Sequence, residues 1–71
     1  MQILVFKTNL TDANRINDVE SSLDVHPHIY QWNVDLNDSD NILRVMSADI
    51  KGTEVETLLF NAGYYCEELQ D

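Results

Sequence analysis

The hydrophobic period of this chain changes from helical to extended between residues 23 and 30. Before the change, Ile16, Val19 and Leu23 are spaced i, i+3 and i+7, which places them on one face of an amphipathic helix. Because alternate residues of a strand share a face, alternation of apolar and polar residues predicts a strand with one buried face. After the change, the apolar positions of such an alternation are Tyr30, Trp32, Val34 and Leu36.

Three further strands are predicted from short apolar segments and turn-forming residues. Residues 2–8 form a short apolar run, which is typical of a strand in length and composition. Residues 37–41 are turn formers, and residues 42–48 favour a strand that makes a hairpin with the preceding one. A last strand is expected over residues 64–69, followed by a tail of residues 70 and 71.

A second helix is predicted after residue 52. Thr53 and Glu56 have the spacing of a capping box, in which each side chain bonds a free amide at the helix start. Gly63 suits the position just after the helix C-terminus, where positive φ is common. The helix would present an apolar face made of Val55, Leu58, Leu59 and Ala62.

The order of elements is therefore βαββαβ, and residues 1–71 are long enough for one domain. Its consistent solution is an α+β, ferredoxin-like sandwich: a four-stranded antiparallel sheet with both helices on one face. We expect one core, containing Ile16, Val19, Leu23, Trp32, Val34, Val55, Leu58 and Leu59.

The charge of the chain restricts its partners. Thirteen acidic and four basic residues give a formal net charge of −9. Nucleic acids and anionic membranes repel such a surface, so neither is expected as a partner. Basic protein partners and hard cations stay open, and so does the simpler interpretation that the acidic residues only maintain solubility.

Cys66 is the only cysteine, so the chain cannot form an internal disulfide. This fits a reducing compartment. The first fifteen residues lack the basic and apolar regions of a signal peptide, and no apolar run approaches the length of roughly 20 residues that spans a membrane. A cytoplasmic location is the resulting expectation.

The segment from Asn9 to Leu23 resembles the metal-binding loop and first helix of heavy-metal-associated, copper-chaperone-like domains. That family carries a Gly-Met-x-Cys-x-x-Cys loop ahead of a helix. Leu10 takes the Met position here, and Asp12 and Arg15 fall where the two cysteines would be. The helix positions of the family are matched by Val19, Glu20 and Leu23.

The second half of the chain resembles the same family. Pro27-His28-Ile29 is similar to the Pro-Gly-Val before the second strand, and Trp32-x-Val34-Asp35-Leu36 is similar to that strand. Leu59-x-x-Ala62-Gly63-Tyr64 is similar to the closing Ile-x-x-Ala-Gly-Tyr. The resemblance implies the ferredoxin-like fold, and the family's Cu(I) or Zn(II) chemistry needs two soft thiolates. A carboxylate and a guanidinium cannot replace them, so no metal or other cofactor is expected.

Other polar residues suggest no stronger site. Asp12 is expected to support the helix N-terminus behind an N-cap at Thr11, with Arg15 lying along the helix as a solvated charge. His26 and His28 fall at the other end of that helix, roughly 18 Å away at 1.5 Å per residue. Catalysis by Cys66 would need an adjacent base, so Cys66 is expected to be a buried structural thiol and no enzyme is predicted.

An apolar surplus suggests an interface. If Ile3 and Val5 face the helices, a second apolar set lies on the open face of the sheet. A one-residue slip would exchange the two faces. The set consists of Leu4, Phe6, Ile42 and Met46, and Tyr65 is a candidate addition to it.

Two functional hypotheses follow. The first is a metal-free binding module that acts as a homodimer or with a protein partner. The second is a metal-ion binding or transport protein that uses non-standard ligands such as Asp12, the histidines or Cys66.

Overall fold

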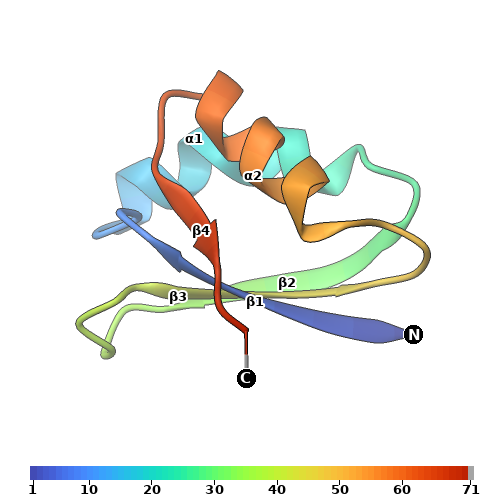
Figure 1. The fold of residues 1–71 in the computed structure, drawn as a ribbon. Helices are drawn as coiled ribbons and strands as arrows, with labels where there is room; N and C mark the ends of the chain where they lie inside the picture. Colours follow the sequence, from blue (N-terminus) through green and yellow to red (C-terminus); the bar gives the residue numbers. More distant parts are fainter. Residues whose placement is uncertain (71) are drawn as a thin grey trace.

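The computed structural model describes residues 1–70 of the 71-residue chain; Asp71, the end of the predicted tail, lies outside them. The predicted order βαββαβ is confirmed (Figure 1). The elements are β1 (Gln2–Thr8), α1 (Ala13–Asp24), β2 (Ile29–Asp35), β3 (Ile42–Ser47), α2 (Gly52–Asn61) and β4 (Cys66–Glu68).

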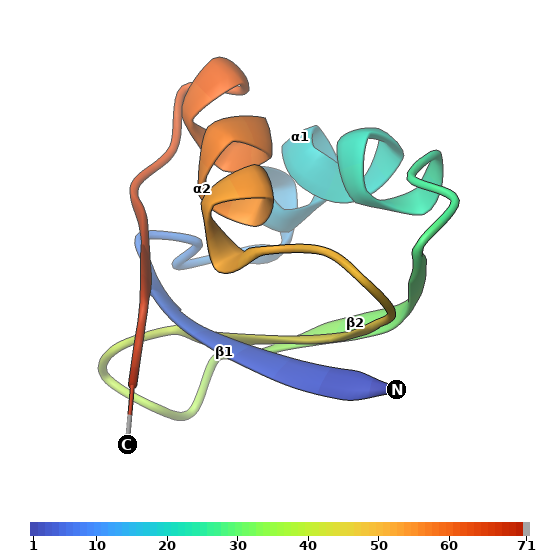
Figure 2. The same cartoon turned by 45° about the vertical axis from the view of Figure 1, so that its right-hand side comes forward.

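The four strands form one antiparallel sheet in the order β2-β3-β1-β4. Both helices cover the same face of this sheet, and the other face is open (Figures 1 and 2). This is the predicted ferredoxin-like arrangement, with β2 and β4 as the two edge strands. Within the described residues, neither helix is long and apolar enough to cross a membrane.

The core lies between the sheet and the helices. Four of the eight predicted core residues, Val19, Leu23, Val55 and Leu59, are fully buried. The other four pack against this core while keeping some exposure: Ile16, Trp32, Val34 and Leu58. Further fully buried apolar side chains come from β1, from β3 and from the loop after β1: Phe6, Leu43, Val45 and Leu10.

The predicted facing of β1 is wrong by one residue. Phe6 is fully buried and Leu4 packs against the core, whereas Ile3 is 58% exposed. The run from Ile3 to Phe6 is apolar throughout, so its composition does not distinguish the two faces. Lys7 does, because its charge requires solvent and places Ile3 and Val5 on the same open face.

The predicted alternation of β2 holds at Trp32 and Val34 but fails at both ends. A register irregularity lies between Ile29 and Gln31, so Ile29 is buried and Tyr30 is 61% exposed. A bulge of this kind inserts one residue and exchanges the faces on its far side. Leu36 is exposed because the strand ends one residue earlier, at Asp35.

The structure corrects both predicted helix starts. The N-cap of α1 is Asp12 rather than Thr11. Helix α2 begins at Gly52, with Lys51 as an N-cap that makes no side-chain hydrogen bond. Thr53 therefore lies inside the helix, and the predicted capping box does not form.

The C-terminus of α2 matches the prediction. Gly63 has φ +93, a conformation that favours glycine. The amide of Gly63 donates to the carbonyl of Phe60 at 2.9 Å, and the amide of Tyr64 donates to that of Leu59 at 2.9 Å. This pair of hydrogen bonds is a Schellman motif, which ends the helix and turns the chain toward β4.

Candidate functional site

The loop between β1 and α1 takes the place that the resemblance assigns to a metal site. Asp12 has an extended backbone, and its Oδ1 accepts a hydrogen bond from the amide of Arg15 at 2.9 Å. The other carboxylate oxygen lies 3.5 Å from Nε of Arg15. Asp12 thus supports the helix N-terminus, as predicted, while Arg15 pairs with it instead of being only solvated.

Hydrogen bonds of Thr8 and Asn9 connect this loop to other parts of the fold. The hydroxyl of Thr8 donates to the carbonyl of Asn41 at 2.6 Å and accepts from the amide of Leu10 at 3.1 Å. The side-chain carbonyl of Asn9 accepts from the amide of Tyr65 at 2.9 Å. Leu10, at the family's Met position, is fully buried. These hydrogen bonds, with the burial of Leu10, engage the polar groups of the loop and fix its conformation.

A tyrosine connects the start of β4 to α1. The hydroxyl of Tyr64 donates to a carboxylate oxygen of Asp18. This hydrogen bond is the main cause that raises the pKa of Tyr64 above its ordinary value. The pair was not predicted, because Asp18 and Tyr64 are distant in sequence and only the fold brings them together.

The residues of this loop do not fit a Cu(I) ion. Cu(I) prefers soft sulfur ligands, and a guanidinium is a cation without a lone pair to donate. The carboxylate of Asp12 is already engaged by an amide and by Arg15. Across residues 1–70, no three side chains of histidine, cysteine, aspartate or glutamate come together in a metal-holding geometry.

The two histidines lie together at the far end of α1. Their ring centroids are 5.9 Å apart, and the amide of His28 donates to Nδ1 of His26 at 3.1 Å. Nδ1 of His26 is therefore an acceptor, which places the proton of the neutral ring on Nε2. That nitrogen lies 3.3 Å from Oε2 of Glu54. Both ring nitrogens of His26 are thus engaged by protein groups.

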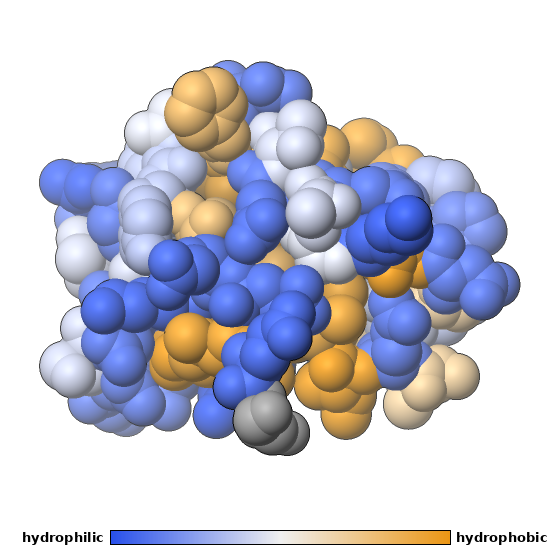
Figure 3. Space-filling view, in the orientation of Figure 1, coloured by the Kyte–Doolittle hydropathy of each residue, from blue (hydrophilic) through white to orange (hydrophobic). Residues whose placement is uncertain are grey.

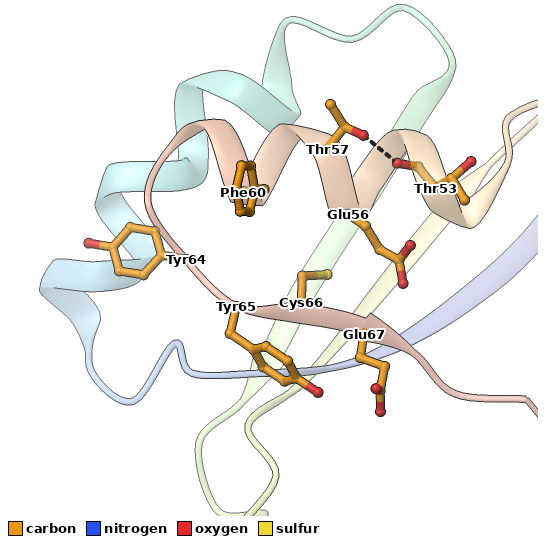
Figure 4. Close-up of a pocket in the computed structure, with 8 residues that line it drawn as sticks. All are labelled: Thr53, Glu56, Thr57, Phe60, Tyr64, Tyr65, Cys66 and Glu67. Atoms are coloured by element: carbon orange, nitrogen blue, oxygen red, sulfur yellow. Dashed lines mark hydrogen bonds between the residues drawn. The ribbon is translucent and has the colours of Figure 1, made fainter.

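The predicted interface residues do not all share one face. Leu4 and Phe6 face the helices, which corrects their assignment. Met46 lies beside Ile3 on the open face, and Ile42 follows the same alternation but is only 6% exposed. Tyr65 is 48% exposed and points away from the helices (Figure 4).

A groove of about 590 Å³ lies between α2 and the edge strand β4. Cys66 lies in it and is half-buried, whereas a buried thiol was predicted. Burial, with the charges of Glu56 and Glu68, raises the pKa of the Cys66 thiol to about 12. The thiol is therefore protonated at neutral pH, and no signal in the sequence predicted this groove.

Comparisons with known proteins identify the fold. No protein-family model matches the chain, and no curated protein matches it. Among solved structures, the yeast copper transporter domain Ccc2a aligns with a TM-score of 0.84 at 15% identity, over 100% of this chain and 99% of that one. A copper-binding domain from HMA7, a P-type ATPase, aligns with a TM-score of 0.83 at 22% identity, over 99% and 96%.

The first domain of the human copper chaperone for SOD1 aligns with a TM-score of 0.77 at 23% identity, over 93% of this chain and 89% of that one. These likenesses establish the ferredoxin-like fold of heavy-metal-associated domains. At these identities they establish the fold alone. This chain has that fold with a single cysteine.

Proposed function

We propose that this chain is a non-enzymatic binding module that keeps the heavy-metal-associated fold, lacks the family's thiolate site and acts through protein–protein contacts. The observation that carries the proposal is the chemistry of Asp12 and Arg15. These residues occupy the predicted cysteine positions and satisfy each other as helix cap and ion pair. Because the polar groups of these two residues are used in contacts within the loop, the loop has a structural role and does not supply a set of metal ligands.

The absence of catalytic function is part of the same proposal. A nucleophilic cysteine needs a lowered pKa or an adjacent base. Cys66 has the opposite environment, because burial and the neighbouring carboxylates of Glu56 and Glu68 favour the neutral thiol. His26 is engaged with Glu54.

The partners that we propose are a second copy of the chain or another protein in the cytoplasm. A net charge of −9 disfavours nucleic acid and anionic membranes. The alternative hypothesis, metal handling through Asp12, the histidines or Cys66, is opposed by the contacts that engage Asp12 and His26.

A cysteine graft tests this proposal. Replacing Asp12 and Arg15 together by cysteine puts two thiols at the loop-to-helix junction, where the helix N-terminus lowers their pKa. The double variant should gain about one Cu(I) per chain, because two thiolates then face one ion. Each single variant is the matched control and should bind far more weakly. A folded double variant without Cu(I) affinity would contradict the assignment of this loop as the lost metal site.

A further inference from the structure

The groove between α2 and β4 is formed by one stripe of the helix and the start of the edge strand. From α2 come Thr53, Glu56, Thr57 and Phe60, which recur at the spacing of one helical face. Tyr64, Tyr65, Cys66 and Glu67 follow one another on the other side. Figure 4 shows Glu56 and Cys66 directed into the space between helix and strand.

Apolar surface is exposed along this groove. The side chain of Phe60 is 77% exposed on the helix side of the groove, and that of Tyr65, which lines the strand side and points away from the helices, is 48% exposed. On the face drawn in Figure 3, where hydrophilic side chains predominate, an apolar area lies over the C-terminal end of α2. Cys66 adds a protonated thiol, which behaves as a small apolar group. Exposed aromatic groups beside a hollow are typical of binding surfaces.

The backbone of β4 offers a free edge of the sheet here. The amide of Leu69 donates to the carbonyl of Val5 at 2.8 Å, toward β1. Amides of successive residues point to opposite sides, so the amide of Glu68 points outward. It donates to Oε2 of Glu56 at 2.8 Å. The carboxylate of Glu56 therefore occupies the place that a neighbouring strand would take.

Charge selects the kind of partner. Glu56 and Glu67 line the groove of a chain that carries −9 overall. Two of the four basic residues, Lys7 and Arg44, lie on the open face of the sheet, where Glu67 stands opposite Lys7 in the register of β1 and β4. The carboxylate of Glu56, which is directed into the groove, therefore makes the groove a more favourable place for a basic segment than the open face.

We propose that this groove binds an extended segment of a partner protein in which basic and apolar residues alternate, added as a fifth strand beside β4. This inference rests on the proposed function of the chain as a protein-interaction module. Strand addition of this type obtains affinity from main-chain hydrogen bonds and specificity from alternate side chains.

The contacts follow from the geometry of the free edge. A carbonyl of the segment replaces Glu56 as the acceptor for the amide of Glu68. The released carboxylate of Glu56 pairs with a basic side chain of the segment, and Glu67 pairs with another. Because successive side chains of an extended chain alternate in direction, the apolar ones enter the hollow beside Phe60 and Cys66.

A labelled synthetic peptide of alternating lysine and valine is the probe. We expect saturable binding in fluorescence anisotropy, with NMR amide shifts confined to α2 and residues 64–68. A peptide with glutamate in place of lysine should not bind, and an oligolysine of equal charge should bind at least about tenfold more weakly. Equal affinity for oligolysine would overturn the proposal, because attraction by charge alone would then explain binding.

Variants locate the site. Phe60→Ser should weaken binding about tenfold or more, while Tyr30→Ser, at an exposed aromatic residue on the opposite edge, should change it less than about twofold. Glu56→Gln keeps an acceptor for the Glu68 amide but removes the charge, so it should also weaken binding. Glu20→Gln, on the exposed surface of α1, is its control. If Phe60→Ser does not fold, Thr57→Arg places a repelling charge in the groove instead.

Three further results would overturn the inference: no binding at millimolar peptide, shifts on the open face of the sheet, or a native dimer that Phe60→Ser dissociates. The second identifies another docking surface, and the third identifies a second copy as the occupant. Both leave the proposed interaction module intact. Cu(I) binding by the native chain, measured separately, is the result that would remove the proposed function itself.

Discussion

The amide of Arg15 donates to Oδ1 of Asp12 at 2.9 Å, and Nε of the same arginine lies 3.5 Å from Oδ2. One carboxylate thus caps α1 and neutralises a charge in its first turn. In the proposed function, this cap and ion pair stand where the resemblance places the two cysteine ligands of the family.

Removal of the cap should destabilise the domain. Asp12→Ala loses the acceptor for the Arg15 amide and should cost about 1 kcal/mol in the free energy of unfolding, measured by urea denaturation. Asp12→Asn keeps the acceptor and should cost less. Thr11→Ala is the control, because Thr11 is not the N-cap. A larger loss for Thr11→Ala than for Asp12→Ala would contradict the assignment.

Trp32 contributes both packing and a hydrogen bond. Its ring is partly buried against the core, and Nε1 donates to Oδ1 of Asp24 at 2.7 Å. Trp32→Ala should therefore cost about 3 kcal/mol, the lower end of the range for such truncations. Trp32→Phe keeps most of the packing and should cost about 1 kcal/mol for the lost hydrogen bond. An unchanged denaturation midpoint for Trp32→Ala would contradict the packing of β2.

Because Phe6 and Ile3 lie on opposite faces of β1, a lysine at the two positions should have opposite effects on folding. Phe6 is fully buried, so Phe6→Lys places a charge in the core and should leave the domain unfolded in circular dichroism. Ile3→Lys, at a side chain that is 58% exposed, should leave the fold intact. A folded Phe6→Lys variant together with an unfolded Ile3→Lys variant would contradict this assignment of the faces of β1 and support the opposite one.

The thiol of Cys66 should react slowly in the native state. Its pKa is raised to about 12, so the thiolate is scarce at pH 8, and alkylation should be at least about a hundredfold slower than in the unfolded chain. The folded state holds this proton more tightly than the unfolded state, whose thiol has a pKa of about 8.5. The associated stability is therefore present below about pH 8.5 and is lost as the pH rises toward 12.

Cys66→Ala isolates this pH dependence from that of other groups. The variant should lose less stability than the native chain between about pH 8.5 and 12, because it has no thiol to titrate. Parallel stability curves for the two proteins over that interval would contradict the raised pKa. Rapid alkylation of the native protein at pH 8 would do the same.

Much of the fold could be predicted from periodicity, because Ile16, Val19 and Leu23 have a helical spacing and Trp32 and Val34 alternate. The sequence resemblance predicted the same topology. The facing of β1 could have been derived as well, since the charge of Lys7 determines which neighbours face solvent. The irregularity before Gln31 could not, because an inserted residue leaves no mark in composition.

The candidate sites were less accessible to sequence reasoning. The resemblance, which places Asp12 and Arg15 at the family's cysteine positions, directed attention to the loop, and the pairing of the two residues is a local contact. The contacts of Tyr64 with Asp18 and of Glu68 with Glu56 join distant segments, so they follow only from the tertiary structure. The groove between α2 and β4 likewise follows only from the tertiary structure.

The most direct test of the account is a competition between the native chain and a Cu(I)-selective chelator. The chelator should retain the metal at every protein concentration, because Asp12 and Arg15 offer no thiolate and Cys66 is a single protonated thiol at neutral pH. The variant with cysteine at both positions 12 and 15 should withdraw Cu(I) under the same conditions. Transfer of about one Cu(I) per chain to the native protein would contradict the metal-free assignment.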